Sequence, residues 1–207
     1  MTGSLIIVGV FLLGCLFGYA GWYPDVLLDG NIELIVLYLL MFQVGMSVGS
    51  DKKLKEILRS IRPRLLLVPL ATIIGSLLFA ALASLAMGRW SLTDCLAVGS
   101  GFGYYSLSSI LIMHLKEPSL GGQMAAELGA IALIANVLRE LFALVGAPFF
   151  GKYFGRFAPI CVAGATSMDT CLPVITRYCG KEWVFVSIFH GVLVDLSVPI
   201  LVSFFCS

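Results

Sequence analysis

Ionisable side chains stand inside stretches of the sequence that are otherwise apolar. Glu127, Arg139, Glu140, Asp169 and Asp195 all lie in such runs. A charged side chain at the centre of a bilayer costs roughly 2.5–3.5 kcal/mol on insertion scales, so each of them needs a partner or a function. Desolvation favours a protonated carboxyl group, whereas a bound cation favours its charged form. Glu140 and Asp169 are therefore predicted to be cavity carboxylates that exchange a proton for a cation, which is the chemistry that a coupled transporter needs.

The residues around Glu140 refine this prediction. Arg139 and Glu140 are sequence neighbours, and they would point about 100° apart on a helix, so they make a poor pair. Asn136 lies one turn before Glu140 and extends a polar stripe on the same face. Arg139 has two open interpretations: a structural ion pair with Asp169 or Glu127, or a contact with the carboxylate of a substrate. Glu127 is also a candidate for the cation-handling group.

Other reactive residue types form no recognisable site. His190 and Asp195 are five residues apart, about 140° around a helix, and packing or interfacial roles are predicted for them. The six cysteines form no CxxC pair, and with two histidines in the chain no metal-ligand spacing occurs. Ser167 and His190 could be offered as a serine–histidine pair, but nothing in the sequence places them together. We therefore expect no metal, no cofactor and no enzymatic activity.

The composition indicates which elements position these residues. Hydrophobic residues make up 59% of the 207-residue chain, charged residues only 12%, and the mean hydropathy is +1.02. An average soluble protein carries roughly 25% charged residues, and this chain would expose large apolar patches in water. The prediction is an all-α integral membrane protein, a single polytopic transmembrane domain over 1–207. Helices of about 20 residues cross a bilayer, and about seven such segments are found: 4–21, 31–50, 65–88, 95–115, 123–150, 158–180 and 183–206.

Two of these segments are predicted to be discontinuous or re-entrant. The run 99–109 reads GSGFGYYSLSS and the run 164–173 reads GATSMDTCLP. A glycine costs about 1 kcal/mol and a proline about 3 in a helix interior, and backbone freed from a helix must line a cavity or be buried in protein. The alternative is close helix packing through small residues. Paired interruptions are typical of transporter binding sites.

The hydroxyl groups in these runs are candidate substrate ligands. Ser106 lies in the first run, and Thr166 and Ser167 in the second. If a half-helix began near Ser167, its free N–H groups would form an anion site for an amino acid's α-carboxylate. Thr166 or Ser167 could equally serve as helix caps alone.

A basic run sets the orientation. Six of the 13 cationic residues fall in 51–64, DKKLKEILRSIRPR, between two apolar segments. This pattern favours a cytoplasmic loop under the positive-inside rule over nucleic-acid or anionic-lipid binding. The amino terminus would then be cytoplasmic. Seven complete crossings would place Lys152 and Arg156 outside, mildly against the rule.

Several of these motifs together resemble one family. GFGYYSLSS, NVLRELFAL, GATSMDTCLP, HGVLVDLSVPILVSFF and the earlier MFQVGMSVGSDKKLKEIL are similar, in order, to the bacterial lysine exporter family of the LysO type. The resemblance implies export of L-lysine and its analogues across the bacterial inner membrane, driven by protons or another cation, with functional acids at Glu140 and Asp169. Typical members have further amino-terminal segments, so a small membrane partner supplying them is expected. A homo-oligomer also stays open.

The sequence therefore favours a secondary transporter with alternating access between the fourth, fifth and sixth segments. The ammonium group of lysine would meet Glu140 or Asp169, and its carboxylate would meet 166–167 or Arg139. The alternatives are a membrane subunit of a two-component exporter and an uncoupled channel.

Overall fold

The computed structural model describes residues 13, 16–22, 35, 39, 42, 46 and 63–207. The chain divides into two compact units, Met1–Gly49 and Ser50–Ser207. In the first unit residues 16–19 are helical, and the Phe17 ring lies edge-on to Trp22 at 6.2 Å. Most of the expected segments 4–21 and 31–50, and nearly all of the basic loop 51–64, lie outside the described residues.

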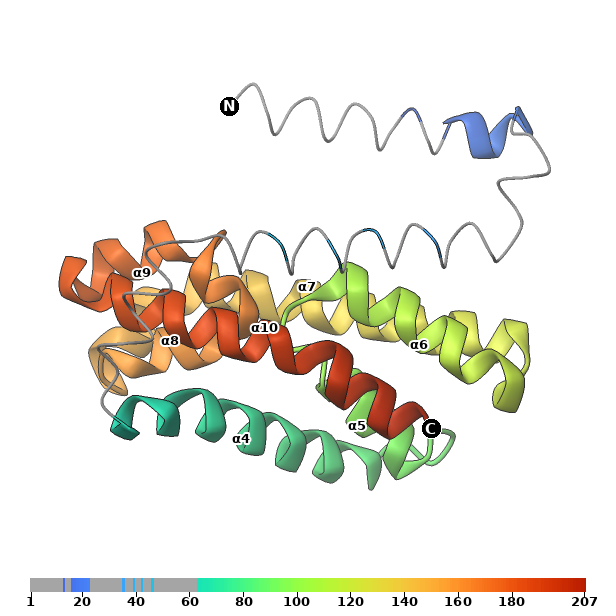
Figure 1. Ribbon diagram of the computed structural model, residues 1–207, viewed down its shortest axis with the longest axis horizontal. Coiled ribbons are helices and arrows are strands. Elements are labelled where there is room, and N and C mark those ends of the chain that lie inside the picture. Colours follow the sequence, from blue (N-terminus) through green and yellow to red (C-terminus); the bar gives the residue numbers. More distant parts are fainter. Residues whose placement is uncertain are drawn as a thin grey trace. The chain divides into compact units, whose positions relative to one another are not determined.

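The second unit is built of helices (Figure 1), and residues 63–207 contain no strand. Their order is η2 (Pro63–Leu66), α4 (Leu67–Ser84), α5 (Leu92–Gly99), α6 (Tyr105–Leu120), α7 (Gly122–Tyr153), α8 (Phe157–Ala163), η3 (Gly164–Met168), α9 (Leu172–Cys179), η4 (Lys181–Trp183) and α10 (Val184–Cys206). The all-α class predicted from the sequence is confirmed.

Within the described part of the chain, three helices are long and apolar enough to cross a membrane: Leu67–Ser84, Gly122–Tyr153 and Lys181–Cys206. They correspond to the expected segments 65–88, 123–150 and 183–206. Large apolar side chains such as Leu70, Ile74 and Phe142 are exposed on them, which suits a lipid environment and not water. The chain is a membrane-embedded protein.

The expected segment 95–115 is a helical hairpin. Lys116 Nζ, on α6, lies 2.9 Å from Asp94 Oδ1, on α5, although these residues would be roughly 33 Å apart along one continuous helix. The chain therefore reverses between α5 and α6, at residues 100–104. We call residues 91–120 hairpin 1, with its tip at 100–104 and its base at the ion pair.

The expected segment 158–180 is a second hairpin. Arg156 Nη1, before α8, lies 2.7 Å from Glu182 Oε1, after α9. The chain turns back through η3 and residues 169–171. We call residues 156–182 hairpin 2, with its tip at 164–171. The half-helix considered from the sequence to begin near Ser167 begins instead at Leu172, because residues 164–168 form a 3-10 turn.

Helix α7 places the two hairpins at opposite ends of this unit. It starts at Gly122, directly after hairpin 1, and ends at Tyr153, directly before hairpin 2. The hairpin bases therefore lie at opposite ends of α7, and the tips point toward each other, as Figure 1 shows for α5 and α6 against α8 and α9. A long helix followed by a hairpin thus occurs twice, as α4 with hairpin 1 and as α7 with hairpin 2.

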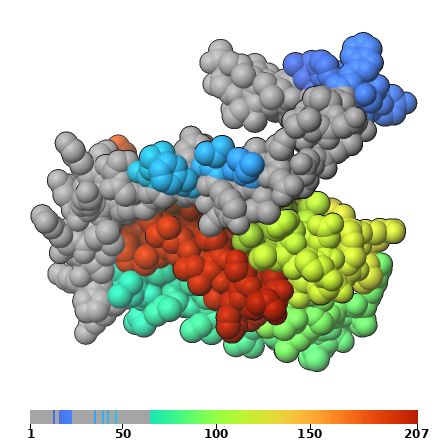
Figure 2. All heavy atoms as spheres, turned by 45° about the vertical axis from the view of Figure 1, so that its right-hand side comes forward, coloured from blue at the N-terminus to red at the C-terminus, as the bar shows by residue number. Residues whose placement is uncertain are grey.

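Helix α10 is the central packing element. It contacts η3, α5, α6 and α4, and Figure 2 shows it on the surface between α4 and α6. Gly191 permits its closest approach: a Cβ there would lie 2.7 Å from Met168 Cβ and 2.9 Å from the Ala165 carbonyl oxygen. A side chain at this position would push α10 away from hairpin 2.

Candidate functional site

The tips of the two hairpins bond directly to each other. Ala165 N donates to the Phe102 carbonyl oxygen at 2.9 Å. Gly164 has a φ of +65°, and a Cβ there would collide with the same oxygen. Phe102, fully buried, has a φ of +45°, which is an uncommon backbone conformation for a bulky residue. Such conformations persist where the surroundings enforce them, often at functional sites.

Asn136 holds the tip of hairpin 1 against α7. Its Oδ1 accepts a hydrogen bond from Gly103 N at 2.7 Å, and its Nδ2 donates to the Ala132 carbonyl at 2.8 Å and to Ser108 Oγ at 3.3 Å. The side chain is buried. Gly103 N would otherwise be a backbone donor without a partner in a non-helical turn at membrane depth.

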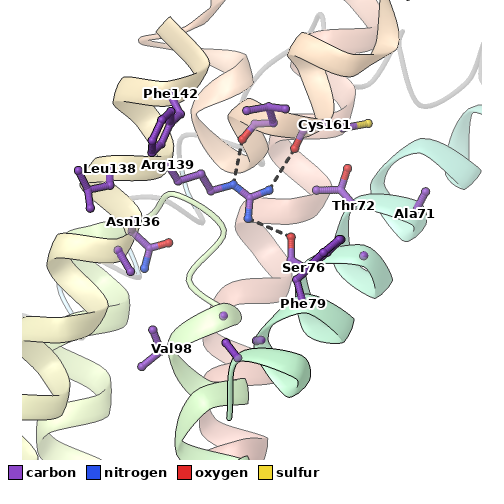
Figure 3. A pocket seen from close by; sticks show the side chains of 16 residues that line it. Ala71, Thr72, Ser76, Phe79, Val98, Asn136, Leu138, Arg139, Phe142 and Cys161 are labelled. Atoms are coloured by element: carbon purple, nitrogen blue, oxygen red, sulfur yellow. Dashed lines mark hydrogen bonds between the residues drawn. The ribbon is translucent and has the colours of Figure 1, made fainter. Parts of the chain in front are cut away.

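Arg139, one turn later, holds hairpin 2. Its Nε donates to the Val162 carbonyl at 2.9 Å, its Nη2 to the Cys161 carbonyl at 3.0 Å and its Nη1 to Ser76 Oγ at 3.0 Å (Figure 3). The two carbonyls belong to the last turn of α8, where a cation meets the negative end of the helix dipole. Arg139 therefore binds backbone carbonyls in place of the acidic partner considered from the sequence.

A cavity of about 690 Å³ lies beside Arg139, between α4, α5, α7 and α8. Its polar lining comes from Thr72, Ser76, Asn136 and Arg139, and Figure 3 shows Arg139 reaching across it toward α4 and α8. Its other lining residues are small or apolar, and none is acidic. A carboxylate, and not an ammonium group, fits this charge distribution.

Three acidic residues, Glu140, Asp169 and Asp195, interact electrostatically at the tip of hairpin 2. Asp169 follows η3 and is exposed, and its Oδ1 accepts a hydrogen bond from Thr170 N at 2.6 Å. Asp169 and Asp195 interact electrostatically, and Glu140 and Asp169 both interact with Cys171 at the tip. Neither Glu140 nor Asp195 accepts a hydrogen bond from any residue between 63 and 207, although Asp195 is only 5% exposed. Their oxygens have lone pairs available for a cation.

The remaining candidates lie away from these acids or are already bonded. Glu127 pairs with Arg89 at 2.8 Å, near the start of α7. Ser106 is exposed in the first turn of α6. The Thr166 hydroxyl donates to the Ala163 carbonyl at 2.9 Å, and the Ser167 hydroxyl donates to the Ser187 carbonyl at 3.0 Å. The two hairpin 2 hydroxyls therefore point into the protein.

Two residues for which the sequence predicted packing or interfacial roles lie next to the site. Asp195 joins the acids around Asp169, and His190 contacts Ser167 at the tip of hairpin 2. The sequence signal for them is their position, since they are the one histidine and the one acidic residue of α10, a helix of 23 residues without lysine or arginine. Helical spacing alone does not show which neighbour such a residue meets.

At the base of hairpin 1, Asp94 and Lys116 form a buried ion pair. Burial alone would raise the pKa of Asp94, but hydrogen bonds from Ser91 and Lys116, together with the charge of Lys116, hold that pKa below its ordinary value. Ser91 and Asp94 also form a capping box at the start of α5. This base is a structural ion pair and not a site with an open position.

Comparisons with known proteins agree on one family. Residues 8–206 match the family model described as "Lysine exporter LysO". The chain is 33% identical to "Lysine exporter LysO" of Escherichia coli (strain K12), over 98% of this chain and 64% of that protein. It is 30% identical to a "Putative lysine exporter" of Haemophilus influenzae, over 99% of this chain and 96% of that protein. The chain thus spans less than two thirds of the Escherichia coli relative.

No solved structure matches the chain significantly. The family match covers both hairpins, α7 and α10, so it includes every residue of the tips described above. This chain belongs to the lysine exporter LysO family.

Proposed function

We propose that this chain exports L-lysine from the cytoplasm as an ion-coupled secondary transporter, with its substrate site at the meeting point of the two hairpin tips. The observation that carries this proposal is the set of electrostatic interactions of Glu140, Asp169 and Asp195 at the tip of hairpin 2. Membership of the family, and the names of the two relatives, support lysine as the substrate.

The acids suit the cationic part of lysine. Asp169 is exposed and makes the first contact with an ammonium group, and Asp195 and Glu140 offer unbonded oxygens. A buried carboxylate without a hydrogen-bond donor strongly favours either a proton or a cation. Lysine and a proton therefore compete for the same acids, and this competition couples the outward movement of one to the inward movement of the other.

Arg139 suits the carboxylate of lysine. A guanidinium group has five N–H donors, and Arg139 uses three of them for Val162, Cys161 and Ser76. The remaining two, at the wall of the 690 Å³ cavity, can bind a carboxylate. This assignment replaces the hydroxyls of Thr166 and Ser167, which are bonded to backbone carbonyls.

Charge supports a definite orientation. The hairpin 2 end has more cationic than acidic residues: Lys152, Arg156, Arg177 and Lys181, with Glu182 as the acid. The hairpin 1 end has more acidic than cationic residues: Asp94, Glu117 and Glu127, with Arg89 and Lys116 as the cations. The positive-inside rule places the hairpin 2 end in the cytoplasm. The start of α4, directly after the basic run 51–64, lies at this same end.

This orientation differs from the one that seven complete crossings would give. A full crossing by 95–115 puts Lys152 and Arg156 outside, whereas a hairpin returns the chain to the side from which it entered and puts them inside. Hairpin 2 then enters from the cytoplasm and hairpin 1 from the opposite side. Small movements of either tip could expose the site to one side at a time, as alternating access requires.

Efflux of radiolabelled lysine from bacteria lacking their own lysine exporter tests the proposal. We expect efflux that a protonophore abolishes, and its loss in Asp169→Asn and Asp195→Asn at unchanged membrane abundance. Glu182→Gln, at the exposed base of hairpin 2, is the matched acidic control and should keep efflux. Normal efflux in Asp169→Asn would refute the site. Efflux that appears only after a small membrane partner is added would support the two-component form, and flux that persists with the protonophore would support a channel.

A further inference from the structure

We propose that His190 is a proton-binding site that locks the tip of hairpin 2 to α4 and α10, separate from the acids around Asp169. This proposal rests on the proposed transport function for its role in coupling. His190 is fully buried at 0% exposure, in the second turn of α10. A buried histidine in a membrane helix is costly unless both of its ring nitrogens are bonded.

Both ring nitrogens of His190 meet a hydroxyl group. Nε2 lies 2.8 Å from Thr72 Oγ1 on α4, and Nδ1 lies 3.0 Å from Ser167 Oγ in η3. The imidazole therefore bridges two elements that lie far apart in the sequence. One of them, η3, directly precedes Asp169, so the bridge reaches the segment that presents the acid.

The two hydroxyls already have acceptors for their protons. Thr72 Oγ1 donates to the Val68 carbonyl at 3.1 Å, and Ser167 Oγ donates to the Ser187 carbonyl at 3.0 Å. A hydroxyl group has one proton, so both hydroxyls turn lone pairs toward His190. The ring satisfies both lone pairs only when both nitrogens carry hydrogen, which is the imidazolium form.

The neutral ring must break one of these bonds. Its unprotonated nitrogen is an acceptor, and the hydroxyl beside it has to rotate its proton away from a carbonyl and toward the ring. If Ser167 rotates, α10 and η3 lose one of two reciprocal bonds, keeping the one in which Ser187 Oγ donates to the Ser167 carbonyl at 2.6 Å. In that case the uptake of one proton at His190 adds a hydrogen bond between hairpin 2 and α10, and its release removes that bond. If Thr72 rotates instead, the bond that changes is its own bond to the Val68 carbonyl within α4.

The charged group near His190 disfavours proton binding to the ring, so a bound proton can also be released. Arg139, from α7, is the charged group that interacts with the ring. Asp169 and Asp195 interact with each other. The other charged residues on the elements packed against α10 lie at the hairpin bases: Asp94, Lys116, Glu117, Arg156, Arg177, Lys181 and Glu182. The hydrogen bonds to Thr72 and Ser167 therefore favour the imidazolium form of His190, whereas burial and the nearby charge of Arg139 disfavour it.

The chain offers a direct spectroscopic test, because it contains two histidines. In a His114→Gln background, His190 is the sole source of ring signals in protein labelled with ¹⁵N-histidine and reconstituted in lipid. We expect the ring to change between one and two protonated nitrogens as the pH falls from 9 to 5. Thr72→Val and Ser167→Ala each remove an acceptor and should lower the titration midpoint by about one pH unit, a tenfold change in proton affinity. Ser197→Ala, also on α10, is the matched control and should leave the midpoint unchanged.

Transport supplies the second readout. In proteoliposomes, His190→Gln should lose at least tenfold in lysine flux driven by a pH gradient while keeping lysine–lysine exchange, and His114→Gln should keep both. A ring that stays neutral over this pH range, or full gradient-driven flux in His190→Gln, would overturn the proposal. If the parent protein carries no lysine in either assay, the proposed function fails, and the nitrogen titration still decides whether His190 binds a proton.

Discussion

Replacing Arg139 by lysine tests whether the geometry of the guanidinium group, and not its charge alone, holds hairpin 2. Arg139 bonds the Val162 and Cys161 carbonyls and the Ser76 hydroxyl. A lysine keeps the charge but lacks the planar guanidinium group. Its single nitrogen can reach either the carbonyls of hairpin 2 or the Ser76 hydroxyl on α4, but not both at once. About two hydrogen bonds to a charged group are lost, at about 1.5–3 kcal/mol each, so the expected destabilisation is about 3–6 kcal/mol.

The assay is thermal unfolding in detergent followed with a thiol-reactive dye. Cys171 and Cys179 are free and buried in the described structure, so they become reactive as hairpin 2 opens. A loss of 3 kcal/mol corresponds to a fall in Tm of at least about 6 °C for a domain of this size. Arg89→Lys is the matched control: Arg89 is 62% exposed, and its pair with Glu127 is worth at most about 1 kcal/mol. An Arg139→Lys protein that unfolds within 2 °C of its parent would refute the role of Arg139.

Three further outcomes follow from the fold. Asp94→Asn leaves Lys116 buried without its partner and should lower the free energy of unfolding by about 3–5 kcal/mol. Because the pKa of Asp94 is depressed in the folded state, the parent protein should lose this stabilisation as the pH falls below about 4. An Asp94→Asn protein should show no such loss of stability with pH. Gly164→Ala forces a Cβ into the oxygen of the other tip at a φ of +65°; lysine efflux should fall at least tenfold, and Gly155→Ala, also at positive φ but with open space, should keep it. A reporter inserted after Phe154 should be cytoplasmic and one after Gly121 external. The reverse arrangement, which seven complete crossings would give, would contradict the hairpin topology.

The sequence predicted where the helices break but left open whether the chain is only interrupted there or reverses. Glycines, hydroxyls and a proline at membrane depth are local features, and they mark 99–109 and 164–173 directly. The reversal depends on contacts between residues more than twenty positions apart, the ion pairs Asp94–Lys116 and Arg156–Glu182. No local periodicity encodes such pairs, so segments that cross and segments that re-enter look alike in the sequence.

The sequence likewise identified some residues of the candidate site, and the others became apparent only in the structure. Asp169 and Glu140 stand out by residue type alone, and in the structure both interact electrostatically with Cys171. For Arg139 the sequence leaves open an ion pair with Asp169 or Glu127 and a contact with a substrate carboxylate. The carbonyls at the end of α8 bind it instead of those acids, and that end exists only because α8 stops at Ala163. Asp195 and His190 became candidates only once α10 was packed against hairpin 2.

Lysine counterflow in proteoliposomes containing the purified chain tests the central claim most directly. Counterflow requires a carrier that binds lysine and alternates between two sides, so a channel cannot produce it. We predict that radiolabelled lysine accumulates transiently against unlabelled internal lysine, and that Asp169→Asn reduces this accumulation at least tenfold while Glu182→Gln does not. Equal accumulation by the Asp169→Asn protein and its parent would contradict a lysine site at the hairpin tips.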